Sequence, residues 1–439
     1  MDNFTFIDLF SGIGGFRIAA ERNGGTCLGF SEIATNAIKA YCENFNEDPQ
    51  NNFGNIKKIK EIPHCDLLTA GVPCQSWSVA GKMRGFADER GQLWDDTLYL
   101  LKQSQPETFI FENVKGLADV RNKEALTYIM NAISEIGYYA TPLLLDSADF
   151  GVPQSRVRLY IVGFKDFGMW MRFRMENPHI EPSLGSVLDG CEKTDSVRYH
   201  KNNGILSANE NGFADYFMFK DLRGGDTVLH SWDLYEGVTR RQRDICRLMM
   251  QHRRRKEYGD KDGNPMSLEA LQGLDPTIRE EELDAIIAKG IMKRVGEKYE
   301  FKHSRITTGI DGVMRIFMPT ARAFATLTAS DSPDYVTPVV VRGDTLEQYK
   351  KNFIEQVYRP HNYRKITKEE ACRMQGFPQD FILPSTRAAW MKLIGNSVAI
   401  PVVEHIIKCI CETGVYQKNS VAENGKSHQV DCLEQEQPL

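Results

Sequence analysis

The sequence predicts an α/β fold whose first domain is an open, Rossmann-like sheet, joined to a second, smaller domain. Short apolar segments that resemble buried strands alternate with helix-like segments through residues 4–164. Glycine-rich or polar turns follow several of these strands, where open parallel sheets hold their ligands. Residues 237–257 differ from this pattern, because they contain eight Lys or Arg and only two acidic residues.

Composition limits the class of protein. The 439 residues allow two or three domains, and the net charge of −5 restricts nucleic-acid binding to local patches. Ten cysteines, with paired spacing only at 409 and 411, favour neither a disulfide framework nor a zinc site. The first strand starts at Phe4, which leaves no room for a signal peptide, and no apolar run approaches membrane length. We expect a cytoplasmic, reduced protein with no metal and no membrane partner.

A strand over residues 4–10, the turn Ser11-Gly-Ile-Gly-Gly15 and a helix over 16–21 form the first unit. This order lets the backbone approach a bound cofactor closely. The glycine spacing is not the dinucleotide fingerprint, because residue 17 is arginine. A second strand, 26–30, ends at Glu32, which is suited to a ribose hydroxyl or is a solvated strand end. The pattern is shared by nucleotide and S-adenosylmethionine binders.

Cys74 follows a predicted strand, residues 66–70, and the turn formers Gly71 and Pro73. A cysteine placed there is either a nucleophile or one more buried apolar side chain. The following loop, 76–92, contains three glycines and the basic residues Lys82, Arg84 and Arg90. It is either a mobile cationic lid or an ordinary surface loop.

Helices are expected over 93–102 and 122–136, and strands over 108–114 and 138–146. Glu112 lies near the end of an apolar strand, where burial raises a carboxyl pKa and makes a proton donor, unless a buried arginine pairs with it. Arg156 and Arg158 alternate with apolar residues, which predicts that they share one face of a strand.

Together these segments resemble the DNA (cytosine-5) methyltransferases of the bacterial restriction-modification type. The similarity rests on six motifs in the family's order: Asp8-Leu-Phe-Ser-Gly-Ile-Gly-Gly15, Glu32, Pro73-Cys74-Gln75, Glu112-Asn-Val114, Gln154-x-Arg156-x-Arg158 and Gly395-Asn-Ser-Val398. Gly54-Asn-Ile56 stands where the family often has Gly-Asp-Ile, and Ile33 replaces an aromatic residue.

The resemblance implies a Rossmann-like S-adenosylmethionine-dependent methyltransferase sheet and assigns the site. The catalytic residues would be Cys74, Glu112, Arg156 and Arg158. S-adenosyl-L-methionine would bind Phe10, Ser11, Gly12, Gly14, Gly15, Glu32, Ile33, Asn55, Ile56, Pro73, Leu93, Asn396 and Ser397. Double-stranded DNA would contact Gln75, Ser78, Lys82, Arg84, Arg90, Arg253, Arg254 and Arg255.

The implied domains are a catalytic domain, 1–164 completed by 385–412, and a target-recognition domain, 165–384. Within the second, a helix over 239–256, helices at 267–273 and 280–289 and strands at 291–295 and 298–302 suggest a winged-helix-like insert near 237–303. Its basic run either contacts phosphates or is a solvated face. The acidic, weakly apolar residues 413–439 predict a disordered tail.

The implied reaction adds the Cys74 thiolate to carbon 6 of a flipped-out cytosine, so that carbon 5 can accept a methyl group. Alternatives remain: a transfer RNA cytosine-5 methyltransferase, a DNA-binding protein with an inactive catalytic fold, or, least consistent with the glycine spacing, a nicotinamide dehydrogenase. A monomer that acts beside a cognate restriction endonuclease is the expected setting.

Overall fold

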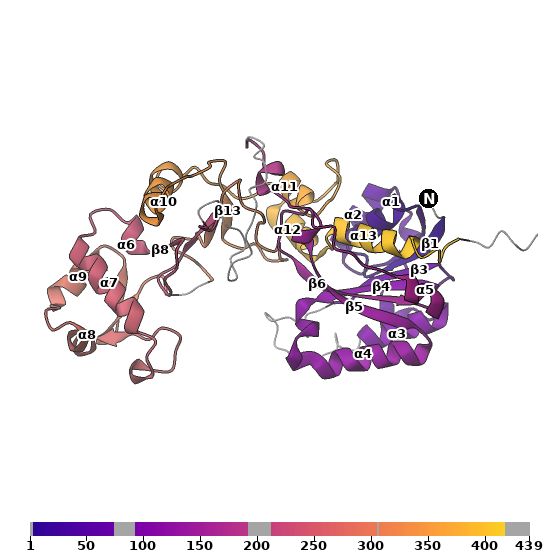
Figure 1. Ribbon diagram of the computed structural model, residues 1–439, viewed down its shortest axis with the longest axis horizontal. Coiled ribbons are helices and arrows are strands. Elements are labelled where there is room, and N and C mark those ends of the chain that lie inside the picture. The colour runs from indigo at the N-terminus through magenta and orange to yellow at the C-terminus, as the bar shows by residue number, and fades with distance from the viewer. Residues whose placement is uncertain (1–2, 74–92, 192–211, 305–306, 418–439) are drawn as a thin grey trace, which may run out of the picture.

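The computed structural model describes residues 3–73, 93–191, 212–304 and 307–417 (Figure 1). Six strands form one sheet in the order β2-β1-β3-β4-β6-β5. Their bounds are Phe4–Leu9 for β1, Gly25–Ser31 for β2, Leu67–Gly71 for β3, Thr108–Val114 for β4, Tyr139–Asp146 for β5 and Val157–Phe164 for β6. Strands β1 to β4 are parallel, and β6 is antiparallel to both neighbours. The predicted α/β sheet is confirmed.

Helices cover both faces of this sheet because its strands are apolar on both sides. Phe4 and Phe6 of β1 pack in a cluster with α1 and α13, whereas Ile7 and Leu9 pack in a second cluster with α3 and α4. The helices that flank the sheet are α1 (Gly15–Arg22), α2 (Thr35–Phe45), α3 (Leu93–Ser104), α4 (Lys123–Ile136), α5 (Phe167–Arg172) and α13 (Ile400–Cys411). This layering leaves the carboxyl ends of the parallel strands for a ligand.

The carboxyl-terminal part of the chain returns to the first domain. Helices α11 (Lys368–Arg373), α12 (Arg387–Asn396) and α13 contribute to the cluster that contains Phe4, and residues 366–383 belong to it as well. Residues 366–383, which the expected boundary at 385 assigns to the second domain, thus pack in the same core as Phe4. Tyr416 stacks on Phe4 with ring centroids 4.6 Å apart, and its hydroxyl bonds Thr108 Oγ1. A disordered tail from 413 is thus wrong for 413–417, while 418–439 lie outside the described residues.

One stretch, Arg387–Cys411, is apolar and long enough to cross a membrane, contrary to the sequence-based expectation, and 67% of its most apolar window is buried inside the protein. It consists of α12 and α13, which supply core residues such as Trp390, Val403 and Ile407. The apolar character of this stretch is therefore explained by its packing against the sheet.

The second domain has a four-stranded sheet in the order β13-β12-β7-β8. The strands are β7 (Tyr216–Phe219), β8 (Val228–Leu229), β12 (Arg315–Phe317) and β13 (Asp334–Val336), and α10 (Leu346–Phe353) runs into a π-helical turn, Ile354–Tyr358. Phe217 stacks on Phe353 at 3.9 Å between ring centroids, which fixes α10 on the sheet. Figure 1 places this sheet between the first domain and an outer helical unit.

The outer unit has its own hydrophobic core, centred on Trp232, Ile245 and Leu283. Its elements are α6 (Ser231–Leu234), α7 (Arg240–His252), β9 (Met266–Ser267), α8 (Leu268–Leu274), α9 (Glu280–Ala288), β10 (Met292–Val295) and β11 (Lys298–Phe301). The three-stranded sheet has the order β10-β11-β9. The order α7-β9-α8-α9-β10-β11 is that of winged-helix units, and we keep the name winged-helix unit for residues 231–303.

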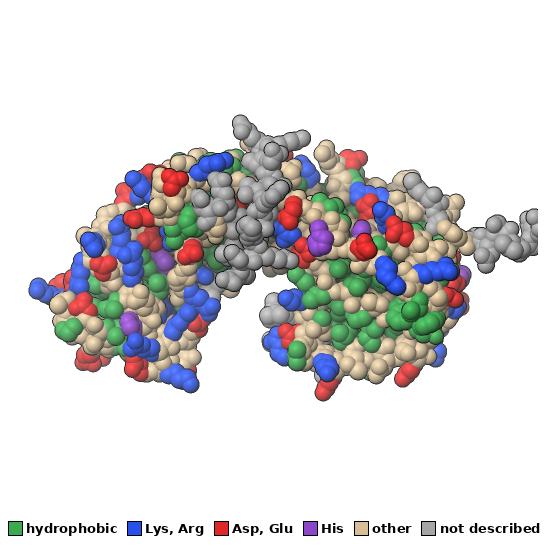
Figure 2. Space-filling view, viewed as in Figure 1, with side chains coloured by type: hydrophobic (Ala, Val, Ile, Leu, Met, Phe, Trp, Pro, Cys, Tyr) green, Lys and Arg blue, Asp and Glu red, His purple; other side chains and the backbone are tan. Residues whose placement is uncertain are grey.

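The molecule has the shape of an arch. Figure 2 shows a wide hollow between the lobe that carries the six-stranded sheet and the lobe that ends in the winged-helix unit. In Figure 1, α8 and α9 lie at the end of the molecule farthest from the first domain, and β8 lies nearer to the hollow.

Candidate active site

The carboxyl ends of β1, β2, β3 and β4 bring together most of the site residues that the structure describes. Register pairs Leu9 with Ser31 and with Ala70, and Gly71 with Glu112. Phe10, Glu32 and Pro73 directly follow these strand ends or lie within two residues of them. The sheet therefore gathers residues distant in the sequence along one edge.

The loop after β1 has an unusual backbone. Phe10 has φ 52°, Gly12 φ 55° and Gly14 φ 86°, and a positive φ at a phenylalanine costs roughly 1–3 kcal/mol. The Gly12 amide donates to Glu32 Oε2 at 2.9 Å, and the Ser11 amide donates to the Ser31 carbonyl at 3.0 Å. These bonds hold the strained loop against the end of β2.

Glu32 is oriented by backbone amides. Its Oε1 accepts from the amides of Ile33 and Ala34 at 2.7 Å each, while Asn52 Oδ1 accepts the amide of Glu32 at 3.1 Å. The Ile33 side chain is 68% exposed, so it is available to a ligand that lies over this strand end. The carboxylate is fixed at the rim of the crevice and keeps lone pairs for a hydroxyl donor.

The turn that includes Asn55 and Ile56 lies beside the same strand end. Ser31 Oγ donates to the Gly54 carbonyl at 2.7 Å, and Asn55 Oδ1 accepts the Lys57 amide at 3.0 Å. The Asn55 side chain therefore caps a 3-10 turn, and Ile56 is buried. Leu93, which begins α3, is half-buried against the cluster of apolar residues below this edge.

The crevice has polar atoms that a ligand could satisfy. Within the described part of the chain, the buried Ser11 Oγ and Asp8 Oδ2 have no hydrogen-bond partner. A Cβ built on Gly12 would meet no atom within 4 Å, so the loop faces open space there. Buried orphan oxygens beside a fixed carboxylate fit a ligand that carries hydroxyl or amine donors.

Asp8 makes the stability of the folded protein depend on pH. Burial raises the pKa of Asp8 from 3.8 to about 7, opposed by the hydrogen bond from Thr69 and by the charge of Arg17. The folded protein therefore binds a proton that the unfolded chain releases, so stability is fully present below the unfolded pKa and falls as pH rises towards 7. We expect the cofactor-free protein to lose up to about 4 kcal/mol of unfolding free energy between pH 4 and pH 8 through this group.

Urea unfolding of wild type and Asp8→Asn at both pH values measures this effect. The amide cannot ionise, so the variant should lose less stability across the same interval. Equal losses in the two proteins would contradict the assignment to Asp8.

Glu112 and Arg158 form an ion pair at this edge of the sheet. Arg158 Nε lies 3.0 Å from Glu112 Oε1, and the two side chains are 16% and 12% exposed. Burial raises the pKa of Glu112 above its usual value, although the charges of Arg158 and Arg156 oppose the shift. The carboxyl therefore takes up a proton more readily than an exposed glutamate does, and once protonated it can donate a proton or a hydrogen bond.

Arg156 has a different environment. It precedes β6, is 3% exposed, and donates to the carbonyls of Leu327, Gly395 and Ser397 at 2.9, 3.1 and 2.6 Å. The two arginines therefore have different nearest partners: Arg158 holds Glu112, and Arg156 ties the segment at 395–397 to the first domain. Arg156 is a positioning residue in this arrangement.

Ser397 also approaches the glycine loop. A Cβ added to Gly15 would lie 2.8 Å from Ser397 Oγ and 2.8 Å from Val398 Cγ2, so only glycine permits this contact. Asn396 ends α12 one residue before. The carboxyl-terminal segment therefore packs directly against the glycine loop.

A family model for C-5 cytosine-specific DNA methylases matches residues 4–412. The chain belongs to this family. This methyltransferase is 43% identical over 93% of its length to the type II methyltransferase M.HgiBI of Herpetosiphon aurantiacus, of which 97% is covered. It is 32% identical to M.BanI of Aneurinibacillus aneurinilyticus, with 93% and 96% covered.

Solved structures agree on the fold. An Entamoeba histolytica methyltransferase superposes with a TM-score of 0.52 at 17% identity, covering 94% of this chain and 99% of that one. Spodoptera frugiperda DNMT2 gives 0.52 at 17% identity, with 93% and 99% covered. The methyltransferase is a DNA (cytosine-5) methyltransferase, and its cofactor is S-adenosylmethionine.

Several predicted site residues of the methyltransferase lie outside the described residues: Cys74, Gln75, Ser78, Lys82, Arg84 and Arg90. The chain just before Cys74 is nevertheless held in place, because Asn113 Nδ2 donates to the Val72 carbonyl at 3.1 Å. Asn113 is 1% exposed, so this bond couples the end of β4 to the turn that carries Pro73.

Three residues that organise the site are absent from the sequence-based assignment: Asp8, Asn52 and Asn113. A charged residue inside an apolar strand was a usable signal for Asp8, since burial of an unpaired carboxylate is costly. Asn113 lies inside the motif Glu112-Asn-Val114, which was a usable signal although its contact with the Val72 carbonyl was not predictable. Asn52 acts through the backbone of Glu32, a contact that no local pattern reveals.

The basic run after α7 is divided by the fold. Arg253 is fully buried, its guanidinium lies 5.1 Å from the Phe301 ring centroid, and it donates to the Gly263 carbonyl at 2.9 Å. Its predicted contact with DNA is therefore wrong, because the aromatic ring and carbonyl enclose it. Arg254 and Arg255 have side chains 37% and 53% exposed and remain available to phosphates.

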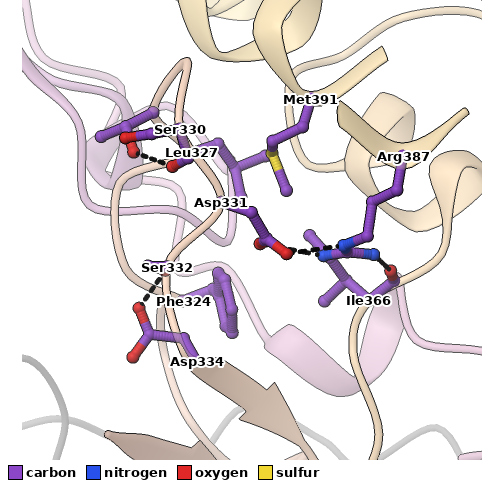
Figure 3. Close-up of a pocket in the computed structure, with 10 residues that line it drawn as sticks. Phe324, Leu327, Ser330, Asp331, Ser332, Asp334, Ile366, Arg387 and Met391 are labelled. Atoms are coloured by element: carbon purple, nitrogen blue, oxygen red, sulfur yellow. Dashed lines mark hydrogen bonds and ion pairs between the residues drawn. The ribbon is translucent and has the colours of Figure 1, made fainter. Parts of the chain in front are cut away.

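The residues that line the pocket drawn in Figure 3 hold separate parts of the methyltransferase together. Arg387 Nε pairs with Asp331 Oδ2 at 2.8 Å, and Arg387 Nη1 donates to the Ile366 carbonyl at 2.6 Å. Leu327, whose carbonyl accepts Arg156, lines the same pocket. These contacts join residues 324–334 to α12. They also hold in place the Leu327 carbonyl that accepts the hydrogen bond from Arg156.

Removing Arg156 should therefore destabilise the protein. We expect Arg156→Met to cost roughly 3–5 kcal/mol of unfolding free energy, because three carbonyls lose a charged donor in the interior. Thermal or urea unfolding measures it. Arg158→Met is the matched control, since Arg158 is more exposed and should lower activity more than stability. A cost for Arg156→Met below about 1 kcal/mol would contradict this role.

Proposed function

We propose that the protein methylates carbon 5 of a cytosine within a specific duplex DNA sequence through a covalent adduct with Cys74, as the modification enzyme of a type II restriction-modification system. The observation that carries the mechanism is the Glu112–Arg158 pair at 3.0 Å, beside the turn that leads to Pro73. The setting is supported by the relatives called type II methyltransferases.

In this mechanism the Cys74 thiolate bonds to carbon 6 of the flipped-out cytosine, which ends aromaticity and makes carbon 5 nucleophilic. Glu112, held by Arg158, binds ring nitrogen 3 and donates a proton as charge develops there. When bound, S-adenosylmethionine supplies the methyl group. Transfer of the carbon-5 proton to a water molecule, return of the ring proton to Glu112 and departure of the Cys74 thiolate then restore the aromatic ring.

The crevice residues would hold the cofactor in this scheme. Glu32 would accept the ribose hydroxyls, the Phe10 ring would lie against adenine, and Asn55 would face the adenine edge. Ser11 Oγ, buried and without a partner among the described residues, would bond the amino-acid part. Asn396 and Ser397 would close the crevice from the carboxyl-terminal side.

The second domain would read the DNA sequence. The hollow lies between the lobe that carries the six-stranded sheet and the lobe that ends in the winged-helix unit, and Lys and Arg side chains line part of it (Figure 2). Flipping a base out of a duplex costs a few kcal/mol, which contacts on both sides of the hollow would offset. We also propose that the protein acts as a monomer in the cytoplasm, beside a cognate endonuclease.

Transfer of labelled methyl groups tests the substrate. We expect incorporation into duplex DNA and none into total transfer RNA, and bisulfite sequencing of DNA from an expressing cell should show one recurring methylated sequence. Incorporation into transfer RNA alone would overturn the proposal. Analytical ultracentrifugation with and without DNA tests the monomer.

A further inference from the structure

Helix α9 of the winged-helix unit is unsuited to DNA. In helix-turn-helix units the second helix of the pair, here α9, enters the major groove. The exposed side of α9 carries Glu280, Glu281 and Asp284, and Arg294 is bound to two of them at 2.7 and 2.8 Å. An acidic helix is repelled by phosphates, and α9 lies on the side of the unit away from the hollow (Figure 1).

A cationic cluster lies elsewhere, where the turn between β7 and β8 meets the turn after α7. Arg223 Nη2 lies 2.8 Å from Asp262 Oδ2, and Arg254 Nε lies 3.0 Å from Asp262 Oδ1. A Cβ on Gly224 would contact Met250 Cε at 3.8 Å, so the β7–β8 turn packs on α7. One exposed carboxylate therefore positions two guanidinium groups from separate segments.

Lys220 adds a third cation to the cluster. Its pKa is lowered, first by burial and then by the charges of Arg223 and Arg254. Among the residues that the structure describes, the only polar partner of its ammonium is the Met218 sulfur at 3.9 Å. Asp262 pairs with the two arginines, whereas the Lys220 ammonium has no carboxylate partner among the described residues. An anion placed among the three cations would relieve their repulsion.

We propose that Lys220, Arg223 and Arg254 bind a backbone phosphate of the duplex, so that the second domain holds DNA where the β7–β8 turn meets the turn after α7, and not through α9. The inference rests on the proposed DNA methylation and adds the anchor of the second domain. Arg223 and Arg254, with side chains 49% and 37% exposed, are accessible for this contact. Strand β8, which follows the β7–β8 turn that carries Arg223, lies towards the hollow (Figure 1).

If the cluster binds a phosphate, the affinity for DNA should depend on salt concentration in a specific way. Each lost contact should lower the slope of log affinity against log salt by about 1 and weaken binding roughly tenfold at 0.1 M salt. Because the three cations share that phosphate, we expect a loss of up to this size in each of Lys220→Gln, Arg223→Gln and Arg254→Gln, and the full loss when the three changes are combined. The loss should be equal on a duplex that contains the methylated sequence and on a scrambled duplex, because phosphates carry no sequence information.

Fluorescence anisotropy of the full-length protein with both duplexes measures these constants. Arg294→Gln is the matched control, because it removes the same charge from an arginine that is 45% exposed and also paired with carboxylates, but lies beside α9. Arg254→Lys should restore the slope, since a phosphate requires only the charge. Thermal unfolding checks that each variant is folded.

Wild-type slope and affinity in all three glutamine variants, or an equal loss in Arg294→Gln, would overturn the anchor. These results are distinguishable from failure of the proposed function, which would appear as wild-type protein that binds DNA and transfers no methyl group to it. A methylating wild type with unaffected variants refutes only the anchor.

Discussion

Replacing Cys74 with serine should abolish methyl transfer, by on the order of a thousandfold or more, because a hydroxyl at neutral pH does not add to carbon 6. Binding of duplex DNA should stay within about twofold of wild type, since one sulfur contributes little to a large interface. Initial rates of labelled methyl transfer and anisotropy titrations measure the two quantities.

A trapped intermediate gives the control for Cys74. DNA with 5-fluorocytosine at the methylated position cannot lose a proton from carbon 5, so wild type should form a stable adduct at residue 74 and Cys74→Ser should not. Cys409→Ser, a buried cysteine of α13, is the matched control and should leave the adduct intact. Methylation near the wild-type rate by Cys74→Ser would refute the covalent mechanism.

Glu112→Gln should lower the rate of methyl transfer by about 10²- to 10⁴-fold with little change in cofactor affinity, because a positioned proton donor supplies that range. The pH dependence gives a second signature. Burial raises the pKa of Glu112, and its protonated form is the active one, so the wild-type rate should fall as pH rises through that pKa. The glutamine variant cannot ionise and should lack this descending limb.

Single-turnover rates across pH test the role of Glu112. Glu107→Gln, at the opposite end of the same strand, is the control and should keep the wild-type profile. Arg158→Met should lower the rate of methyl transfer less in the Glu112→Gln background than in wild type, because the arginine acts by holding that carboxylate. A glutamine variant with an unchanged descending limb would assign the titration to another group.

The strand ends were predictable because apolar segments and turn formers mark them locally. The predicted strand 108–114 coincides with β4, and the chemistry at its end follows from one carboxyl in an apolar run. Strands β10 and β11 of the winged-helix unit were likewise predicted, at 291–295 and 298–302, although half of their residues are charged.

Burial of charged residues was not predictable. Arg253 and Arg254 are adjacent and chemically identical, but the ring that covers Arg253 belongs to Phe301, far along the chain. The same holds for Arg156, whose partners come from residues 327, 395 and 397. Tyr416 similarly orders a segment whose composition predicts disorder, through a stacking contact with Phe4.

The closure of the first domain by α13 has a consequence for biosynthesis. Residues at 400–411 share a core with Phe4, and the whole second domain separates them in the chain. Helices α1 and α2 can cover part of this face early, but the part that packs on α13 stays open until residues 400–411 have been synthesised. Nascent chains should therefore expose apolar surface there while the second domain is being made.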